Sequence, residues 1–418
     1  MARDVTSVSK YYAISIIGML FFIFGFVTWL NATLIPYLKI ACELTNLESL
    51  FVAFAFYVSY FVLALPSSWV LGKTGFKNGM SLGLIVMSIG SIIFIPAAMM
   101  RFYPLFLTGL FVQGAGLSIL QTASNPYVTI IGPIESAAKR ISIMGIANKI
   151  AGIISPLILG TIVLKDADTI TDKITTMSLA QRTAELDLLS QRVIVPYIVI
   201  AVVLLILALL VKASKLPEID KSGDSDKSGI SRSSIFKYPY LWLGVLSIFL
   251  YVGAEVISVD TIINYGKSIG IKLETSRFFA SFTLFAMVAG YLIGIAAIPR
   301  LISQSKALFY ATALALVLTV LAVVTSGITS VIFIALLGLA NAVMWPAIWP
   351  LSIEGLGKYT KTGSALLIMG IVGGATIPLL YGALSDLHPI GTHYAYLIII
   401  PCYAFIMFFA LKGHRYGK

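Results

Sequence analysis

Charged residues are scarce in this chain of 418 residues. They account for 11% of the sequence, whereas apolar residues account for 59% and the mean hydropathy is +0.97. Soluble domains carry about 25% charged residues, so this composition excludes an ordinary soluble globular protein. It predicts a helical protein that crosses a membrane many times.

Cysteine and histidine are also rare. The two cysteines, Cys42 and Cys402, are separated by most of the chain, which indicates neither a disulfide framework nor a metal site. The three histidines lie in or near loops towards the C-terminal end: His388, His393 and His414. No phosphate loop, nucleophile motif or catalytic cluster is found. We therefore expect no enzymatic activity, no resident metal, and no cofactor beyond a coupling ion.

The net charge of +11 does not predict a nucleic-acid partner, because the basic residues lie mostly in short loops between apolar runs. Basic residues collect in the cytoplasmic loops of membrane proteins. By this rule both termini are expected in the cytoplasm.

Long apolar runs of roughly 20 residues recur along the chain, each long enough to cross about 30 Å as a helix. They lie near 11–36, 47–71, 80–99, 105–132, 141–164, 193–213, 239–265, 276–297, 307–325, 328–352, 363–381 and 391–411. Barrel strands would be about ten residues long with strict alternation. The sequence predicts an all-α polytopic membrane protein with twelve transmembrane helices.

A polar stretch divides these runs into two groups of six. Residues 214–238 are rich in Ser, Gly and charge, which is typical of a linker. We therefore expect an N-terminal six-helix half at 1–213, a cytoplasmic linker at 214–238 and a C-terminal six-helix half at 239–418. The outer segment 165–192 is compatible with either a short amphipathic surface helix or a solvated loop.

Matching features in the two groups indicate an internal repeat. Setting Gly25 against Gly253 also aligns Tyr37 with Tyr265. The fifth and eleventh runs share glycine, proline and glycine at spacing four, as Gly152, Pro156 and Gly160 and as Gly374, Pro378 and Gly382. We expect two pseudo-symmetric halves, with a site near the membrane midplane between them.

The run from Gly109 to Pro133 is unusually polar for a membrane span and is expected to break at Pro126. Gln121 and Asn125 are four residues apart, so they share one face of a helix. Polar groups in hydrocarbon are costly unless they find a partner or face a watery cavity. This run is predicted to form one wall of a polar tunnel; a packing helix whose amides bond to neighbouring helices is the alternative.

Glu48, Lys212 and Arg277 stand next to the ends of runs. Three further charged residues lie well inside the runs: Lys149, Glu255 and Asp260. Ionisable groups inside a membrane are functional candidates, because each carries a cost of several kcal/mol. We expect them to couple a cation or to gate access. A structural ion pair between Lys149 and either carboxylate is an alternative compatible with gating. Asp260 is nearer the outer end, where simple hydration is a further alternative.

Uncharged amides and aromatic rings supply the other cavity candidates. Amides offer donors and acceptors to hydroxyl groups, and a flat ring packs on the C–H face of a sugar. The runs contain one arginine, Arg277, which stands at the end of its run, so an anionic substrate is not favoured, while Glu255 keeps an amine possible. The pattern favours a neutral polyol, with Trp345 and Trp349 alternatively serving only as packing residues. The cavity candidates are Asn31, Gln113, Gln121, Asn125, Asn148, Asn264, Asn341, Trp345 and Trp349; all of them except Gln113 and Asn264 are expected to bind the substrate.

Several motifs resemble the fucose permease family of the major facilitator superfamily, and most of all its bacterial glucose/galactose transporter branch. They are LNATLIPYLK, QTASNPYVTIIGP, YVGAE and EGLGKYTKTGSALLIMGIVGGATIPLLYGALSD. The resemblance covers essentially the whole chain. It implies a symporter that imports a neutral hexose, glucose or galactose ahead of fucose, by alternating access. It further implies a monomer in the bacterial inner membrane.

Two departures from the family concern the coupling ion. Proton-coupled fucose permeases carry an acidic residue where Ala32 stands and a Glu where Gln121 stands. With this pair absent we expect Na⁺ rather than H⁺, bound by oxygens of Glu255, Asp260 or their neighbours. A proton-coupled fucose or hexose symporter is the alternative, with Lys149 as an internal cation. A protein that senses sugar without transporting it is a more distant alternative.

Overall fold

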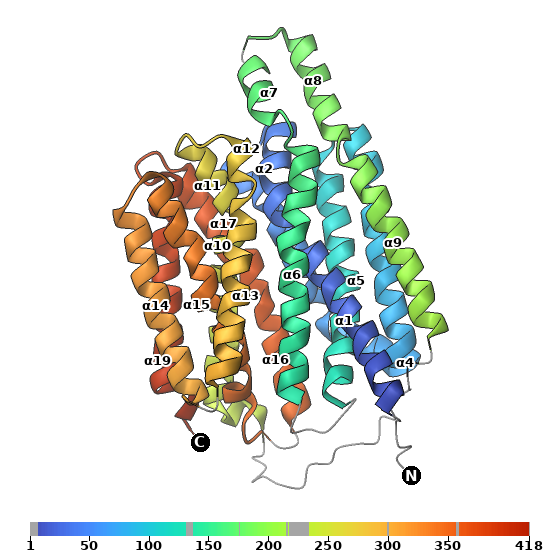
Figure 1. Cartoon of the computed structure of the whole chain (residues 1–418), viewed down its shortest axis with the longest axis vertical. Helices are drawn as coiled ribbons and strands as arrows, with labels where there is room; N and C mark the ends of the chain where they lie inside the picture. The colour runs from blue at the N-terminus through green and yellow to red at the C-terminus, as the bar shows by residue number, and fades with distance from the viewer. Residues whose placement is uncertain are drawn as a thin grey trace.

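Helices make up nearly all of the described chain. The computed structural model describes residues 7–130, 137–174, 176–214, 216, 234–298, 301–356 and 359–417. In Figure 1 the long helices run side by side in one bundle. α1 (Ser7–Trp29) begins and α19 (Ile399–Leu411) ends at the same end, which we call the proximal end; the opposite end is the distal end.

The first half of the chain, up to residue 214, supplies helices that pack mainly on one another, with α4 against α5 and α9, and α1 against α6. After α1 they are α2 (Asn31–Ala41), α3 (Asn46–Ser49), α4 (Phe51–Met99), α5 (Tyr103–Ile130), α6 (Ala137–Val163), α7 (Ala167–Ile174), α8 (Leu179–Gln191) and α9 (Ile194–Ala213).

The second half packs in the same way, with α15 against α10, α13 and α14. Its helices before α19 are η2 (Ile235–Lys237), α10 (Pro239–Asp260), α11 (Ile262–Ser268), α12 (Leu273–Ser276), α13 (Phe279–Ala297), α14 (Gln304–Val324), α15 (Gly327–Ile353), α16 (Thr360–Met369), η4 (Gly370–Val372), α17 (Gly373–Asp386), α18 (Gly391–Tyr394) and η5 (Ala395–Ile398); η6 (Gly413–Arg415) follows α19.

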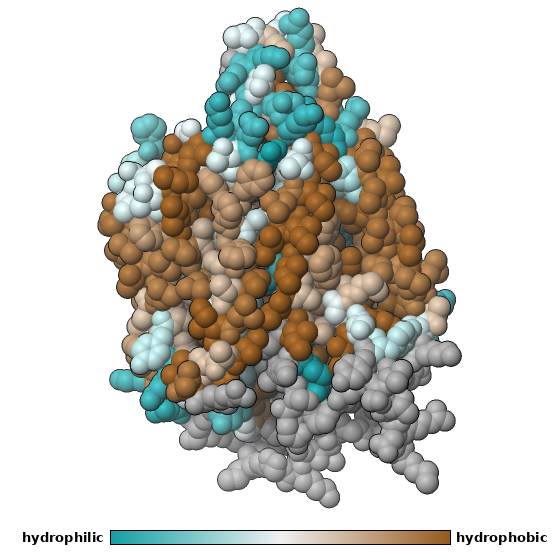
Figure 2. Space-filling model, in the orientation of Figure 1, coloured by the Kyte–Doolittle hydropathy of each residue, from teal (hydrophilic) through white to brown (hydrophobic). Residues whose placement is uncertain are grey.

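The prediction of twelve spans is confirmed. Eleven described helical segments are long and apolar enough to cross a membrane, and the shorter apolar segment Phe51–Ser67 is the twelfth. Two spans lie within α4, where Gly75 has a φ of +77°. Glycine adopts this left-handed conformation without steric cost, so the chain turns there between two spans. Figure 2 shows apolar residues around the middle of the bundle and hydrophilic residues over α7 and α8.

The pseudo-symmetry of the two halves is visible in how helices pack. A Cβ on Gly25 of α1 would lie 1.8 Å from the carbonyl oxygen of Asn148 on α6. A Cβ on its mate Gly253 of α10 would lie 2.5 Å from Ile377 on α17. Both glycines therefore allow the first helix of a half to touch the fifth. The first helix of each half is also interrupted in a similar place, α1 from α2 at Leu30 and α10 from α11 at Thr261, three residues apart in this alignment.

Two local predictions have clear outcomes. The helix containing Gln121 does not break at Pro126, because α5 continues through it to Ile130. The segment 165–192 is helical rather than a plain loop, and forms α7 and α8; Ser178 and Gln181 cap the start of α8 reciprocally. The boundaries 1–213, 214–238 and 239–418 stay a prediction, since residues 217–233 lie outside the described part.

Candidate functional site

An ion pair joins the two halves near the middle of the bundle. The ammonium of Lys149 on α6 donates to a carboxylate oxygen of Glu255 on α10 at 2.9 Å. Both side chains are about nine-tenths buried, with exposed fractions of 8% and 10%. The indole ring of Trp29 covers the ammonium, with its centroid 4.1 Å from Nζ. Glu255, rather than Asp260, is thus the partner of Lys149.

Asp260, the last residue of α10, is fully buried, and neither of its carboxyl oxygens has a hydrogen-bond partner in the described part of the chain. Asp260 is therefore not exposed to bulk solvent. Asp260 lies within electrostatic range of Glu255 and Lys149. Two carboxylates thus share one ammonium in this region. If both carboxylates are ionised, the group carries one unbalanced negative charge, which a monovalent cation would neutralise.

Asn31, the first residue of α2, is another buried polar group without a partner. Its side chain is 1% exposed, and neither amide atom is hydrogen-bonded within the described residues. Unsatisfied buried amides are uncommon because each costs about 1–3 kcal/mol. Asn31 is therefore available to a ligand or to a rearranged neighbour.

Gln121 on α5 is half-buried and donates to the hydroxyl of Tyr60 on α4 at 3.3 Å. Tyr60 stacks on Tyr57, with ring centroids 6.4 Å apart. Tyr57 in turn lies within electrostatic range of Glu255. Gln121, Tyr60 and Tyr57 therefore form a connected group of polar and aromatic side chains whose last member approaches Glu255. The side chain of Asn125 lies outside the described part of the chain.

The other two amides have protein partners. Asn148 accepts a hydrogen bond from the indole of Trp29 at 3.3 Å and donates to the carbonyl of Phe21 at 3.4 Å. Asn341 is fully buried, donates to Ser258 at 3.2 Å and accepts from Tyr403 at 2.9 Å. Asn148 thus orients the ring that covers Lys149, and Asn341 holds α15 against α10 and α19.

Trp345 and Trp349 on α15 form an aromatic surface from the second half. Their rings stack with centroids 5.4 Å apart, and both side chains are partly exposed. Trp345 also contacts Tyr251, whose centroid is 6.4 Å away, and Tyr251 lies one helical turn before Glu255. The tryptophan pair therefore approaches Glu255 through Tyr251, from the second half.

Sequence reasoning missed the aromatic residues of this site. Trp29, Tyr57, Tyr60, Tyr251 and Tyr403 all touch or approach the charged and amide groups. Aromatic residues are frequent in every span of this chain, so composition did not single these out. The one available signal was the position of these aromatic residues on a helical wheel, compared with the positions of Lys149 and Gln121.

Among the described residues, the site offers amide and hydroxyl groups and aromatic rings to a polar molecule, and carboxylate oxygens to a cation. Among the described residues, no group of three or more His, Cys, Asp or Glu side chains could hold a metal ion. Oxygen atoms of Asp260 and Asn31 are of the hard type that alkali cations prefer.

Known proteins resemble this chain over nearly its full length. The glucose/galactose transporter of Brucella abortus is 38% identical over 418 residues, covering 98% of this chain and 96% of that protein. The L-fucose-proton symporter of Escherichia coli is 31% identical over 403 residues, covering 94% of this chain and 90% of that protein.

Solved structures agree. A crystal structure of the Escherichia coli fucose:proton symporter matches with a TM-score of 0.72 at 28% identity, covering 96% of this chain and 98% of that one. A D-xylose-proton symporter shares the fold, with a TM-score of 0.70 at 15% identity. A sequence profile of the Major Facilitator Superfamily matches residues 17–378. The chain therefore belongs to the Major Facilitator Superfamily, and is a multi-pass sugar transporter related to the glucose/galactose transporters and L-fucose-proton symporters.

Proposed function

We propose that this protein is a cation-coupled symporter that imports a neutral hexose, glucose or galactose, by alternating access. The observation that carries the proposal is the placement of two partly exposed surfaces around one buried ion pair. Gln121 with Tyr60 approaches Glu255 from the first half, and Trp345 with Trp349 approaches it from the second. An amide faces hydroxyl groups, and stacked indoles face the apolar side of a pyranose ring.

Every amide of the site stays assigned to sugar binding, but some contact the sugar directly and others act indirectly. Gln121 and Asn125 contact the sugar directly, with Asn31 at the interruption between α1 and α2. Asn148 and Asn341 reach it only after releasing their present partners, or act by holding Trp29 and Tyr403 in place. Glucose and galactose come ahead of fucose because of the relatives named for them.

Sugar uptake by purified variants in proteoliposomes tests this assignment. Gln121→Ala and Asn125→Ala are each expected to abolish uptake of labelled glucose and galactose while the protein still inserts and elutes as a single species. Gln113→Met is the matched control, because Gln113 lies on the same helix but donates to Ser91 within the first half. Full uptake by both Gln121→Ala and Asn125→Ala would refute the proposed sugar site.

For the coupling ion we propose Na⁺, attracted by the unbalanced charge at Asp260. The supporting observations are the lone buried carboxylate of Asp260 and the uncharged side chains of Ala32 and Gln121. The alternative is H⁺, as in the relatives named L-fucose-proton symporters. An inward Na⁺ gradient at uniform pH is expected to drive accumulation of the hexose, and a pH gradient in choline buffer is not. Accumulation driven by the pH gradient alone would assign H⁺ instead.

The remaining assignments follow from this function. We propose a monomer in the bacterial inner membrane with both termini in the cytoplasm, so that the distal end faces outwards. We also propose transport without catalysis. A sensor that binds sugar without moving it would show sugar-dependent thermal stabilisation but no uptake, so the same proteoliposomes distinguish the two.

A further inference from the structure

Two short helices occupy equivalent places at the distal end of the two halves. α3 follows α2 in the first half, and α12 follows α11 in the second. Each is four residues long. The offset that aligns Gly25 with Gly253 also brings α3 onto α12 within one residue. The two short helices are therefore counterparts in the repeat.

Each short helix directs backbone N–H groups at a carboxylate from the opposite half. The amides of Asn46 and Leu47 at the start of α3 donate to Asp386 at 3.0 and 2.8 Å, and the Asn46 side chain donates to the same carboxylate at 2.7 Å. The amide of Glu274 in α12 donates to Asp168 at 3.2 Å. The first N–H groups of a helix lack partners inside it, so a carboxylate there satisfies them.

The lysines near these contacts are also counterparts. Lys39 in α2 aligns with Lys267 in α11. Lys39 lies within electrostatic range of Asp386, and Lys267 lies within electrostatic range of Asp168. In each case the aspartate belongs to the opposite half. Lys39 donates to the side-chain oxygen of Asn46 at 2.5 Å. Each aspartate thus accepts hydrogen bonds at the start of a short helix and also lies within electrostatic range of a lysine.

Glycine is required for the close approach at Gly382, whereas a side chain at its counterpart Gly160 would make an ordinary van der Waals contact. A Cβ on Gly382 of α17 would lie 2.9 Å from the Cα of Leu47, and one on its counterpart Gly160 of α6 would lie 3.5 Å from Arg277, just after α12. The repeated glycine–proline–glycine pattern therefore ends, in each half, where the other half's short helix packs.

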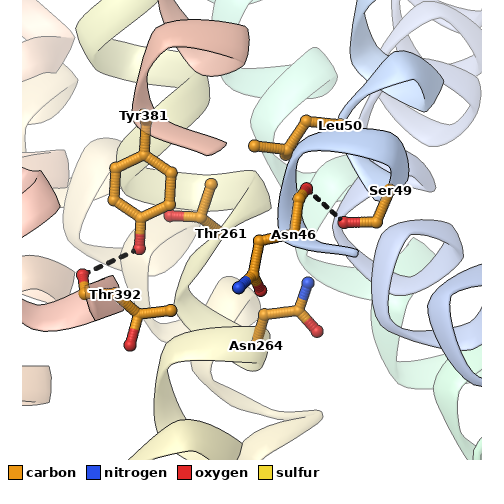
Figure 3. A pocket seen from close by; sticks show the side chains of 7 residues that line it. All are labelled: Asn46, Ser49, Leu50, Thr261, Asn264, Tyr381 and Thr392. Carbon is orange, nitrogen blue, oxygen red and sulfur yellow. Dashed lines mark hydrogen bonds between the residues drawn. The ribbon is translucent and has the colours of Figure 1, made fainter. Parts of the chain in front are cut away.

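Little space remains between the two halves at the distal end. Figure 3 shows a small cavity there, which is lined from the first half by Asn46, Ser49 and Leu50, and from the second by Thr261, Asn264, Tyr381 and Thr392. Its volume is about 10 Å³, so it has room for roughly one water molecule and not for a sugar.

We propose that these contacts form a reciprocal latch, in which Asp386 caps α3 and Asp168 caps α12 to hold the distal end of the transporter closed. Opening this end requires both contacts to break, because each joins the two halves. The Asp386 contact is the stronger one, since it comprises three hydrogen bonds against one for Asp168. The proposal goes beyond the assignment of sugar and ion and does not depend on either.

Accessibility of Ser49 provides the test. Ser49 is fully buried and lines the cavity, so Ser49→Cys, with Cys42 and Cys402 replaced by Ser, should react slowly with a membrane-impermeant maleimide in nanodiscs. Asp386→Ala is expected to raise the labelling rate on the order of tenfold, as for the loss of hydrogen bonds to a charged acceptor. Asp168→Ala should raise it less, and the double variant should exceed both.

Asp187→Ala is the matched control. Asp187 pairs with Arg101 at 3.0 Å at the same end, but within the first half, so its loss should leave the labelling rate unchanged. Unchanged labelling in Asp386→Ala and in the double variant, or an equal increase in Asp187→Ala, would overturn the latch.

A second measurement tests the latch without relying on the labelling of a single cysteine. Spin labels at the exposed distal positions Leu179 and Ser326 report the distance between the halves by electron–electron dipolar spectroscopy. The distance distribution should gain a longer component in Asp386→Ala; a distribution identical to that of the parent would refute the proposal. Should Asp386→Ala fail to fold, Asp386→Asn, which keeps one acceptor oxygen, is expected to give a smaller shift in the same direction. No sugar or ion is needed, so failure here leaves the hexose assignment intact.

Discussion

The ammonium of Lys149 and the carboxylate of Glu255, 2.9 Å apart, connect the fifth span of the first half to the first span of the second. Among the ion pairs between described residues this pair is the most deeply buried, and it lies where the sugar and the ion are proposed to meet. Burying two charges costs several kcal/mol, which their attraction repays only with good geometry. The largest effect on stability is therefore expected when one of the two charged side chains is removed and the other stays buried without its partner.

Single substitutions in this pair should destabilise the protein, and unequally. Lys149→Met leaves Glu255 and Asp260 without a cation, whereas Glu255→Gln leaves Lys149 within electrostatic range of Asp260. We expect Lys149→Met to lower the free energy of unfolding by about 3–5 kcal/mol, and Glu255→Gln by less. Thermal unfolding in detergent, followed by tryptophan fluorescence, measures both.

The double variant Lys149→Met with Glu255→Gln is the control for this prediction. It removes both charges together, so it should be more stable than Lys149→Met alone. A double variant as unstable as Lys149→Met would mean that the pair's charges do not determine stability.

Close packing of the first and fifth spans should make Gly25 intolerant of a side chain. A Cβ there would overlap the carbonyl oxygen of Asn148, so α1 would have to move away from α6. Overpacking of this kind typically costs about 1–3 kcal/mol, and a clash with backbone lies at the upper end. Gly18→Ala, on the same helix, meets only Met144 at 3.7 Å and should be neutral or slightly stabilising. Thermal unfolding of the two variants provides the comparison, and equal stability would contradict it.

The span pattern and the repeat were predictable because they depend on length and hydropathy alone. Runs of about 20 apolar residues leave a helix as the main option in a membrane. The partner of Lys149 was not predictable, because Glu255 and Asp260 are five residues apart on one helix and the sequence does not say which side of α10 faces α6. Nor was it apparent that Asp260 is buried, since its position near the outer end suggested water.

The distal contacts were missed for a different reason. Asn46 and Asp386 are 340 residues apart, and both occur in short polar segments that look like solvated loops. The local signal for α3 was nevertheless present, because Thr45 and Glu48 have the spacing of a capping box and form one. No local pattern indicates that a carboxylate from the other half meets the start of this helix.

Cys42, just beyond the end of α2, should be a slow nucleophile at neutral pH. Burial raises the pKa of its thiol to about 11; Arg101 opposes this shift and Glu43 adds to it. The thiolate is the reactive form, so the rate of alkylation by iodoacetamide should rise about tenfold per pH unit from pH 8 to above pH 10. An exposed control, Leu179→Cys in a Cys42→Ser background, should level off near pH 9. A rate for Cys42 that also levels off near pH 9 would be inconsistent with this shift.

Replacing Asp260 by its neutral isostere should separate coupling from sugar exchange. Asp260→Asn removes the unbalanced charge proposed to attract the cation, while the surfaces of Gln121 and Trp345 remain. Sugar exchange across the membrane at equal Na⁺ should therefore continue, but a Na⁺ gradient should no longer drive accumulation.

The substitution should leave the free energy of unfolding unchanged or raise it, since a buried carboxylate without hydrogen-bond partners is unfavourable. Counterflow and gradient-driven uptake in the same proteoliposomes make the comparison, with Asp187→Asn as a control that keeps both activities. Normal Na⁺-driven accumulation by Asp260→Asn would place the coupling ion elsewhere, and loss of counterflow as well would assign Asp260 to the sugar site.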